Sequence, residues 1–172
     1  MAKNKKPRKA YKPRPVRLDN IKYVVDYVSP LVDYYDGRDG VLKLRIELHD
    51  AINNLRLGKG EHTDFNRLIN ATNVAEALVI LKVGDEHKSV VDDAQKALKT
   101  IGERAFNLKS FTPKASELTA INLLAELHDA QLDVCTLEEL DKASQLVRKI
   151  IASGKVQRIG NKTTQGQPQS VL

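Results

Sequence analysis

The first seventeen residues of the chain hold side chains that can bind phosphate groups. Residues 1–17 contain eight Lys or Arg residues and no Asp or Glu. An arginine can hold a phosphate through two parallel N–H donors, and a lysine adds a point charge. One tyrosine in this segment offers a ring on which a nucleic-acid base can stack. The candidate nucleic-acid-binding residues are therefore Lys3, Lys5, Lys6, Arg8, Lys9, Tyr11, Lys12, Arg14 and Arg17.

This segment, the basic arm (residues 1–17), is predicted to be disordered. Its positive charges repel one another, and Pro7, Pro13 and Pro15 prevent a continuous helix. Three interpretations of the arm stay open. It contacts DNA or RNA without sequence preference, it docks onto an acidic protein, or it is a solubilising tail with no specific partner.

A second candidate for chemistry is the pentapeptide Glu-Leu-His-Asp-Ala, which occurs at residues 47–51 and again at 126–130. The similarity barely extends beyond these five residues, whereas a duplicated helical hairpin would match along its whole length. A shared helix-forming composition and an ancient duplication both explain the repeat. The sequence leaves open whether the repeated segments have a function.

The histidines do not form a predicted metal or acid–base site. Within each pentapeptide the His and the Asp are neighbours on a helix, so their side chains diverge by about 100°. No histidine has a second His or Glu three or four residues away, the spacing that builds a site from one helix. We predict that His128 is buried and hydrogen-bonded in the core, and that His49, His62 and His87 lie on the surface.

Several other classes of site are excluded by composition. Cys135 is the only cysteine, so neither a disulfide framework within the chain nor a Cys-based zinc site can form. The glycines at 58 and 60 lack the spacing and the Lys-Ser/Thr ending of a phosphate loop. No nucleophile elbow or zinc-protease motif is present. We therefore predict no catalytic residue, no metal ligand and no cofactor, and a chain that is not an enzyme.

The net charge of +6 divides unevenly along the 172 residues. Residues 18–155 contain 18 basic and 22 acidic residues, whereas the segment 156–172 adds two basic residues and no acid. The sequence pI of about 9.4 therefore comes from the arm. We predict three parts: a disordered basic arm at 1–17, a helical bundle domain at 18–155 and a disordered polar tail at 156–172.

The apolar periodicity of residues 18–155 is helical almost throughout. We predict a single all-α bundle of about five substantial helices plus a short N-terminal helix, with disordered termini. The Asp-Gly-Arg-Asp-Gly cluster at 36–40 is predicted to be a turn, and Thr136 to open a capping box with Glu139. The substantial helices are expected at about 41–57, from a cap at Thr63 to Gly84, at 88–107, at 113–134 and from 137 to Gly154.

The helix at 113–134 is predicted to be the central element of this bundle. Its first apolar stripe holds the predicted core histidine and runs from Leu118 to Leu132. A second stripe contains Leu123, Leu127 and Val134. A helix that is apolar on two faces is typical of the middle of a bundle.

The opening Lys-Pro-Arg-Lys-Ala-Tyr-Lys-Pro-Arg-Pro-Val, joined to a body that contains Ala-Glu-Leu-His-Asp-Ala-Gln-Leu, resembles small helical proteins of bacteriophages and prophages. No activity is assigned to that group, and the resemblance implies a bacterial cytoplasm. It favours a nonenzymatic accessory protein that contacts nucleic acid through the arm. The alternative is an interaction module, an inhibitor or adaptor of a host factor, that uses the helical body. Phage or host proteins are thus possible partners, a membrane is not expected, and the oligomeric state is left open.

Overall fold

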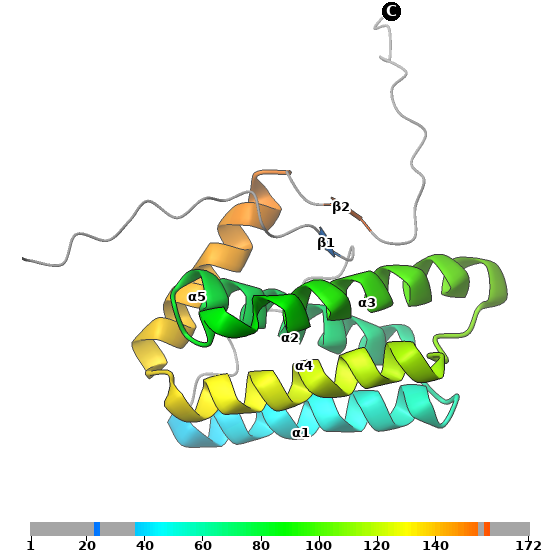
Figure 1. Cartoon of the computed structure of the whole chain (residues 1–172), viewed down its shortest axis with the longest axis horizontal. Coiled ribbons are helices and arrows are strands. Elements are labelled where there is room, and N and C mark those ends of the chain that lie inside the picture. The colour runs from blue at the N-terminus through cyan, green and yellow to red at the C-terminus, as the bar shows by residue number, and fades with distance from the viewer. Residues whose placement is uncertain (1–22, 25–36, 155–156, 159–172) are drawn as a thin grey trace, which may run out of the picture.

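Five helices make up nearly all of the chain that the computed structural model describes, which is residues 23–24, 37–154 and 157–158. The predicted all-α bundle of five substantial helices is confirmed (Figure 1). A short 3-10 turn, η2 (Asp85–His87), precedes the third helix. The helices are α1 (Gly37–Arg56), α2 (His62–Ile80), α3 (Lys88–Leu108), α4 (Ala115–Val134) and α5 (Leu137–Ala152).

Two short strands join the ends of the described chain. Strand β1 (Tyr23–Val24) pairs in parallel with β2 (Gln157–Arg158). The N-terminal helix predicted at these first residues is therefore replaced by a strand at Tyr23–Val24. The run around them is rich in Val and Tyr, which favour extended backbone once a partner strand is available. The residues on either side of this strand, where the rest of the predicted N-terminal helix would lie, are outside the described residues.

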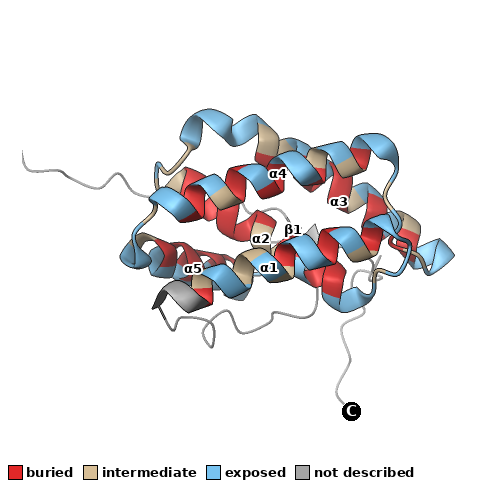
Figure 2. Ribbon diagram, turned by 90° about the horizontal axis from the view of Figure 1, so that it is seen from below, coloured by how far each residue is buried: buried red, intermediate tan, exposed pale blue. Residues whose placement is uncertain are grey.

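Helix α2 lies at the centre of the bundle, a place that the sequence assigns to the helix at 113–134. Helices α1 to α4 lie side by side, with α1 and α3 each next to α2 and α4, while α5 packs obliquely against α2 (Figure 1). The eight residues 72–79 of α2 are consequently all buried. Figure 2 shows this buried stretch between helices whose outer faces are exposed.

Helix α4 keeps one face in solvent, which corrects the predicted second apolar stripe. Leu127 is buried, but Leu123 is 48% exposed and Val134 is 73% exposed. The reason is the position of α5, which covers α2 rather than α4. A helix left uncovered on its outer side exposes the apolar residues of that side.

Two buried polar side chains of the bundle, Gln95 and Gln131, donate hydrogen bonds to α2 and its surroundings. Gln131 of α4 donates from Nε2 to the carbonyl oxygens of Ala75 (3.2 Å) and Val83 (2.9 Å). Gln95 of α3 donates from Nε2 to Oε2 of Glu76, 2.6 Å away in α2. These bonds let α2 carry polar residues on faces that its neighbours cover, because a buried polar group is tolerated when it is hydrogen-bonded.

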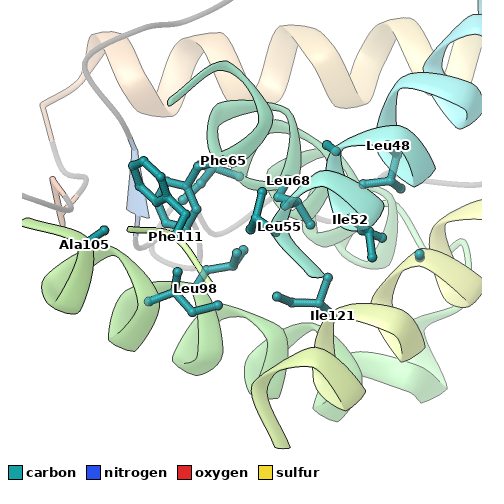
Figure 3. Packing of buried hydrophobic residues seen from close by; sticks show 13 residues of the cluster. Leu48, Ile52, Leu55, Phe65, Leu68, Leu98, Ala105, Phe111 and Ile121 are labelled. Atoms are coloured by element: carbon teal, nitrogen blue, oxygen red, sulfur yellow. The ribbon is translucent and has the colours of Figure 1, made fainter. Parts of the chain in front are cut away.

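The largest cluster of buried side chains fixes one end of the bundle (Figure 3). Phe111, from the segment between α3 and α4, stacks on Phe65 of α2 with ring centroids 4.8 Å apart. Leu55 of α1 and Ile121 of α4 complete the cluster from the opposite side. The connection between α3 and α4 is therefore held inward by an aromatic anchor.

Helix starts differ from the sequence prediction at three places. The turn predicted at 36–40 is wrong from residue 37, because α1 already begins at Gly37. Helix α2 begins at His62, where the N–H of Glu61 donates to Asp64 Oδ2 (3.1 Å), so Thr63 is not its cap. Helix α4 begins at Ala115, two residues after the predicted start. At α2 and α4 an acidic side chain accepts the N–H of the residue just before the helix: Asp64 accepts from Glu61, and Glu117 accepts from Lys114.

The capping box at the start of α5 is confirmed. The N–H of Thr136 donates to Glu139 Oε2 (2.8 Å), and the N–H of Glu139 donates to Thr136 Oγ1 (3.2 Å). None of the helices in the described part of the chain is long and apolar enough to cross a membrane.

Candidate functional site

The nine candidate nucleic-acid-binding residues of the basic arm lie outside the described residues. The arm joins the helical body through a segment of which only Tyr23–Val24 is described, and these two residues lie against α2. The described residues therefore bear on function through the other candidate groups: the repeated pentapeptides, the cysteine and the distribution of charge.

The two pentapeptides lie next to each other, because α1 and α4 are antiparallel neighbours. His49 Nε2 is 2.8 Å from Asp129 Oδ2, so the His of one copy pairs with the Asp of the other. One turn away, Arg45 forms an ion pair with Asp133 and donates to the carbonyl oxygen of Asp129 (3.0 Å). The sequence analysis missed this α1–α4 ion cluster (Arg45, His49, Asp129 and Asp133). Its signal in the sequence is a basic pair, Arg45 and His49, and an acidic pair, Asp129 and Asp133, each with a spacing of four residues.

The α1–α4 ion cluster joins two helices and does not form a recognisable catalytic group. A carboxylate can orient an imidazole for proton transfer, but a reactive group must then lie at the other ring nitrogen. Among the described residues, Asp129 is the one hydrogen-bond partner of His49. The His49 side chain is also 54% exposed, and exposed pairs of this kind contribute about 1 kcal/mol or less.

The second pentapeptide places its histidine in the core, as predicted. His128 is 3% exposed, and its Nδ1 has no hydrogen-bond partner in the described part of the chain. The predicted burial is confirmed, but the predicted hydrogen bond is not found at Nδ1. Burial lowers the pKa of His128 to about 4; nearby Arg45 also lowers it, and Asp129 raises it. The ring is therefore neutral at pH 7.

The remaining histidines and the cysteine behave as surface or packing residues. His49, His62 and His87 are exposed, as predicted. Cys135 ends α4 half-buried, and burial raises the pKa of its thiol, which keeps the sulfur protonated. Within the described residues, no three His, Cys, Asp or Glu side chains lie close enough to hold a metal ion.

Cations on the helix faces are mostly paired with acids. Five lysines form an ion pair with an Asp or Glu three or four residues away on the same helix or turn: Lys82, Lys88, Lys96, Lys99 and Lys142. Three arginines pair across elements or along α2: Arg45, Arg67 and Arg104. Among the described side chains, six cations have no acidic partner within 4.0 Å: Arg56, Lys59, Lys109, Lys114, Arg148 and Lys149.

Four of these six unpaired cations lie at one end of the bundle, on two neighbouring connections. One connection joins α1 to α2, and the other joins α3 to α4. Their proximity is direct, since a β-carbon at Gly58 would lie 3.6 Å from Thr112 Oγ1. We define the basic end by the four cations and three exposed apolar residues on these connections and on the helix ends that lead into them: Arg56, Leu57, Lys59, Phe106, Leu108, Lys109 and Lys114.

The apolar residues of the basic end are among the most exposed of their kind. Phe106 and Leu108 are each 67% exposed, and Leu57 is 54% exposed. Lys109 ends α3 in the left-handed conformation (φ +52°), which glycine normally occupies and which strains a residue with a β-carbon. The basic end therefore carries exposed apolar side chains next to a lysine whose backbone is strained.

Two acids beside the basic end, Asp64 and Glu117, are engaged within the fold. Glu117 accepts two hydrogen bonds from Arg104 (2.9 and 2.7 Å) and one from the N–H of Lys114 (2.7 Å). The Arg104 guanidinium holds the pKa of Glu117 below its ordinary value. Asp64 is likewise bonded to Arg67 and to the helix start. These carboxylates stabilise helix starts, and neither of them pairs with a side-chain cation of the basic end.

Comparison of the chain with protein-family models, with curated protein sequences and with solved structures gives no match. The sequence analysis did not find the basic end, because an unpaired cation is recognised only when the neighbouring helices are in place. The signal in the sequence was weak: an apolar pair at Phe106 and Leu108 directly before Lys109, next to a connection rich in glycine.

Proposed function

We propose that this chain is a nonenzymatic accessory protein of a bacteriophage or prophage that contacts nucleic acid through its basic arm. The observation that carries the proposal is the charge of residues 1–17, eight cations without an acid. Such a segment binds phosphates by releasing the counterions condensed on the nucleic acid. The resemblance of the opening residues to phage proteins supports the assignment to a bacteriophage or prophage.

The charge of the helical body supports the assignment of this contact to the arm. Residues 37–154 contain 16 basic and 18 acidic residues, and most cations on the helix faces are paired. A body with a small negative charge gives no long-range attraction to phosphate. The arm supplies that attraction, and its three prolines reduce the entropy lost when it is ordered on a strand.

Removing residues 1–17 tests the proposal. The deletion changes the net charge from +6 to −2 and removes no described contact of the bundle, so the melting temperature should be nearly unchanged. Affinity for a labelled oligonucleotide, measured by fluorescence anisotropy, should fall at least tenfold. A truncated chain that binds as tightly as the parent would contradict the assignment to the arm.

A second candidate function is a protein–protein contact through the helical body. The outer face of α1 supports such a contact, because Leu42 is 56% exposed and Ile46, one turn further along the helix, is 52% exposed. Capture of bacterial proteins by the intact chain in the presence of nuclease tests this function. A partner that is lost with Leu42→Ser and Ile46→Ser but kept by the arm deletion would favour it over nucleic-acid contact.

A further inference from the structure

One end of the bundle combines features that are separate elsewhere in the described chain. The basic end holds four of the six cations without an acidic partner and three of the eight large apolar residues that are strongly exposed. The connection between α3 and α4 is anchored by Phe111, which stacks on Phe65 (Figure 3). The connection between α1 and α2 is held by the N–H groups of Gly58 and Lys59, which donate to the carbonyl oxygens of Leu55 (3.1 Å) and Asn54 (2.9 Å). The surface is thus built on a rigid support.

We infer that the basic end is a second nucleic-acid contact and that it binds a single strand. This inference rests on the proposed function and deepens it, because it places a contact on the folded body in addition to the arm. In this arrangement Arg56, Lys59, Lys109 and Lys114 hold phosphates, and the exposed ring of Phe106 stacks on a base.

The apolar side chains decide the type of nucleic acid. In a duplex the faces of the bases are stacked on one another, and the outer surface offers phosphates and groove edges. In a single strand each base has a free face that an aromatic side chain can cover. Phe106 and Leu108 gain nothing from a duplex backbone, whereas an unpaired base buries their exposed apolar surface.

Charge complementarity selects an anionic strand over an apolar protein surface. The four cations of the basic end are exposed and have no acidic partner within 4.0 Å among the described residues, and the neighbouring Asp64 and Glu117 are bonded internally. A partner that covered Leu57 and Phe106 without supplying anions would leave these cations partly desolvated and unpaired, which is costly. A phosphate backbone supplies one anion for each nucleotide.

The test uses the full-length chain with three sets of substitutions. The first changes Lys59, Lys109 and Lys114 to Gln, and the second is Phe106→Ala. A matched control changes three paired lysines on other faces, Lys88, Lys96 and Lys142, to Gln. The probes are a labelled oligothymidylate, a duplex of the same length and vesicles that contain anionic phospholipid. Thermal melts show whether each variant is folded, which is expected because all seven side chains are exposed.

The expected results separate the basic end from the arm. Loss of three phosphate contacts should make the log–log salt slope on oligothymidylate less steep by about 2. Phe106→Ala should weaken oligothymidylate binding about fivefold or more and leave duplex binding unchanged. The control should bind like the parent.

Three results would overturn the inference: a triple Gln variant that binds oligothymidylate like the parent, a Phe106→Ala variant that loses only vesicle binding, or equal losses in the control. If the arm deletion keeps full affinity while the triple variant loses it, the proposed role of the arm fails and this inference stands.

Lys109→Gly is an additional variant that separates binding from folding. Glycine relieves the left-handed backbone strain at this position, so the variant should melt at a higher temperature than the parent. It should also bind oligothymidylate more weakly, because one cation is lost. A variant that is more stable and binds with unchanged affinity would contradict a role for Lys109 in the contact.

Discussion

The two copies of Glu-Leu-His-Asp-Ala share five residues but occupy opposite environments. In α1, His49 faces solvent and pairs with Asp129 of the other copy at 2.8 Å. In α4, His128 is 3% exposed, and its Nδ1 has no hydrogen-bond partner among the residues that the structure describes. Identical local sequence therefore gives an exposed residue that contacts a carboxylate in one helix and a neutral core residue in the other.

The difference comes from the neighbours of each histidine and not from the pentapeptide itself. His128 belongs to the stripe of α4 that faces the core, together with Ile121, Leu124 and Leu132. His49 lies beside the buried stripe of α1, next to Leu48, on the edge that meets α4. A shift of one position on a helix turns a side chain by about 100°, enough to move it from core to surface.

The largest effect expected from this comparison is a loss of stability in acid that comes from His128. Its pKa is about 4 in the folded chain and about 6.5 when unfolded, so below pH 6.5 the unfolded state binds more protons. The free energy of unfolding should therefore fall by about 3 kcal/mol as the pH decreases from 6.5 to 4. Urea unfolding at several pH values measures this fall in the free energy of unfolding.

A His128→Leu variant is the control for this pH dependence. Leucine does not titrate, so the fall between pH 6.5 and 5 should be much smaller in the variant. The lowered pKa of Glu117 gives a loss of the same sign, but only below its ordinary value of 4.5. An identical pH dependence in parent and variant would show that His128 is not the titrating group.

The next effect is the cost of removing the buried ring at neutral pH. His128→Ala takes a side chain out of the packed stripe between Leu124 and Leu132 and leaves a cavity. We expect the free energy of unfolding to fall by roughly 1–3 kcal/mol at pH 7. Chemical denaturation measures this value, and an unchanged midpoint would place His128 outside the core.

The smallest effect is expected at the exposed copy. His49→Ala removes one hydrogen bond to Asp129 but leaves the contacts of Arg45 with Asp129 and Asp133 in place. The free energy of unfolding should change by less than about 1 kcal/mol. If His49→Ala destabilises the chain as much as His128→Ala, the two copies are not as different as their burial indicates.

The sequence predicts the parts of the fold that depend on local pattern. The apolar periodicity gives five helices, the Thr136 and Glu139 pair gives a helix start, and the stripe around His128 gives its burial. Each of these depends on residues within one or two turns of a helix. Their physical cause is contained in the segment itself.

The features that were missed depend on how helices meet. Thr72, Asn73 and Glu76 give α2 the composition of a half-exposed helix, and only the packing of α5 and α3 around it buries them. The α1–α4 ion cluster needs the register of two helices that are 80 residues apart in sequence. The basic end likewise needs two connections, far apart in sequence, that come close together at Gly58 and Thr112.

Whether the basic arm binds phosphate is tested most directly by removing its charge and measuring how nucleic-acid binding then depends on salt. The eight Lys and Arg residues of the arm are changed to Gln in the full-length chain, which keeps its length and the helical body. With about four phosphates neutralised by the arm, the parent should show a log–log salt slope near −3.6 or steeper on duplex DNA. The Gln variant should lose that slope and bind far more weakly at low salt. Equal slopes and affinities in parent and variant would contradict a phosphate-binding role for the arm.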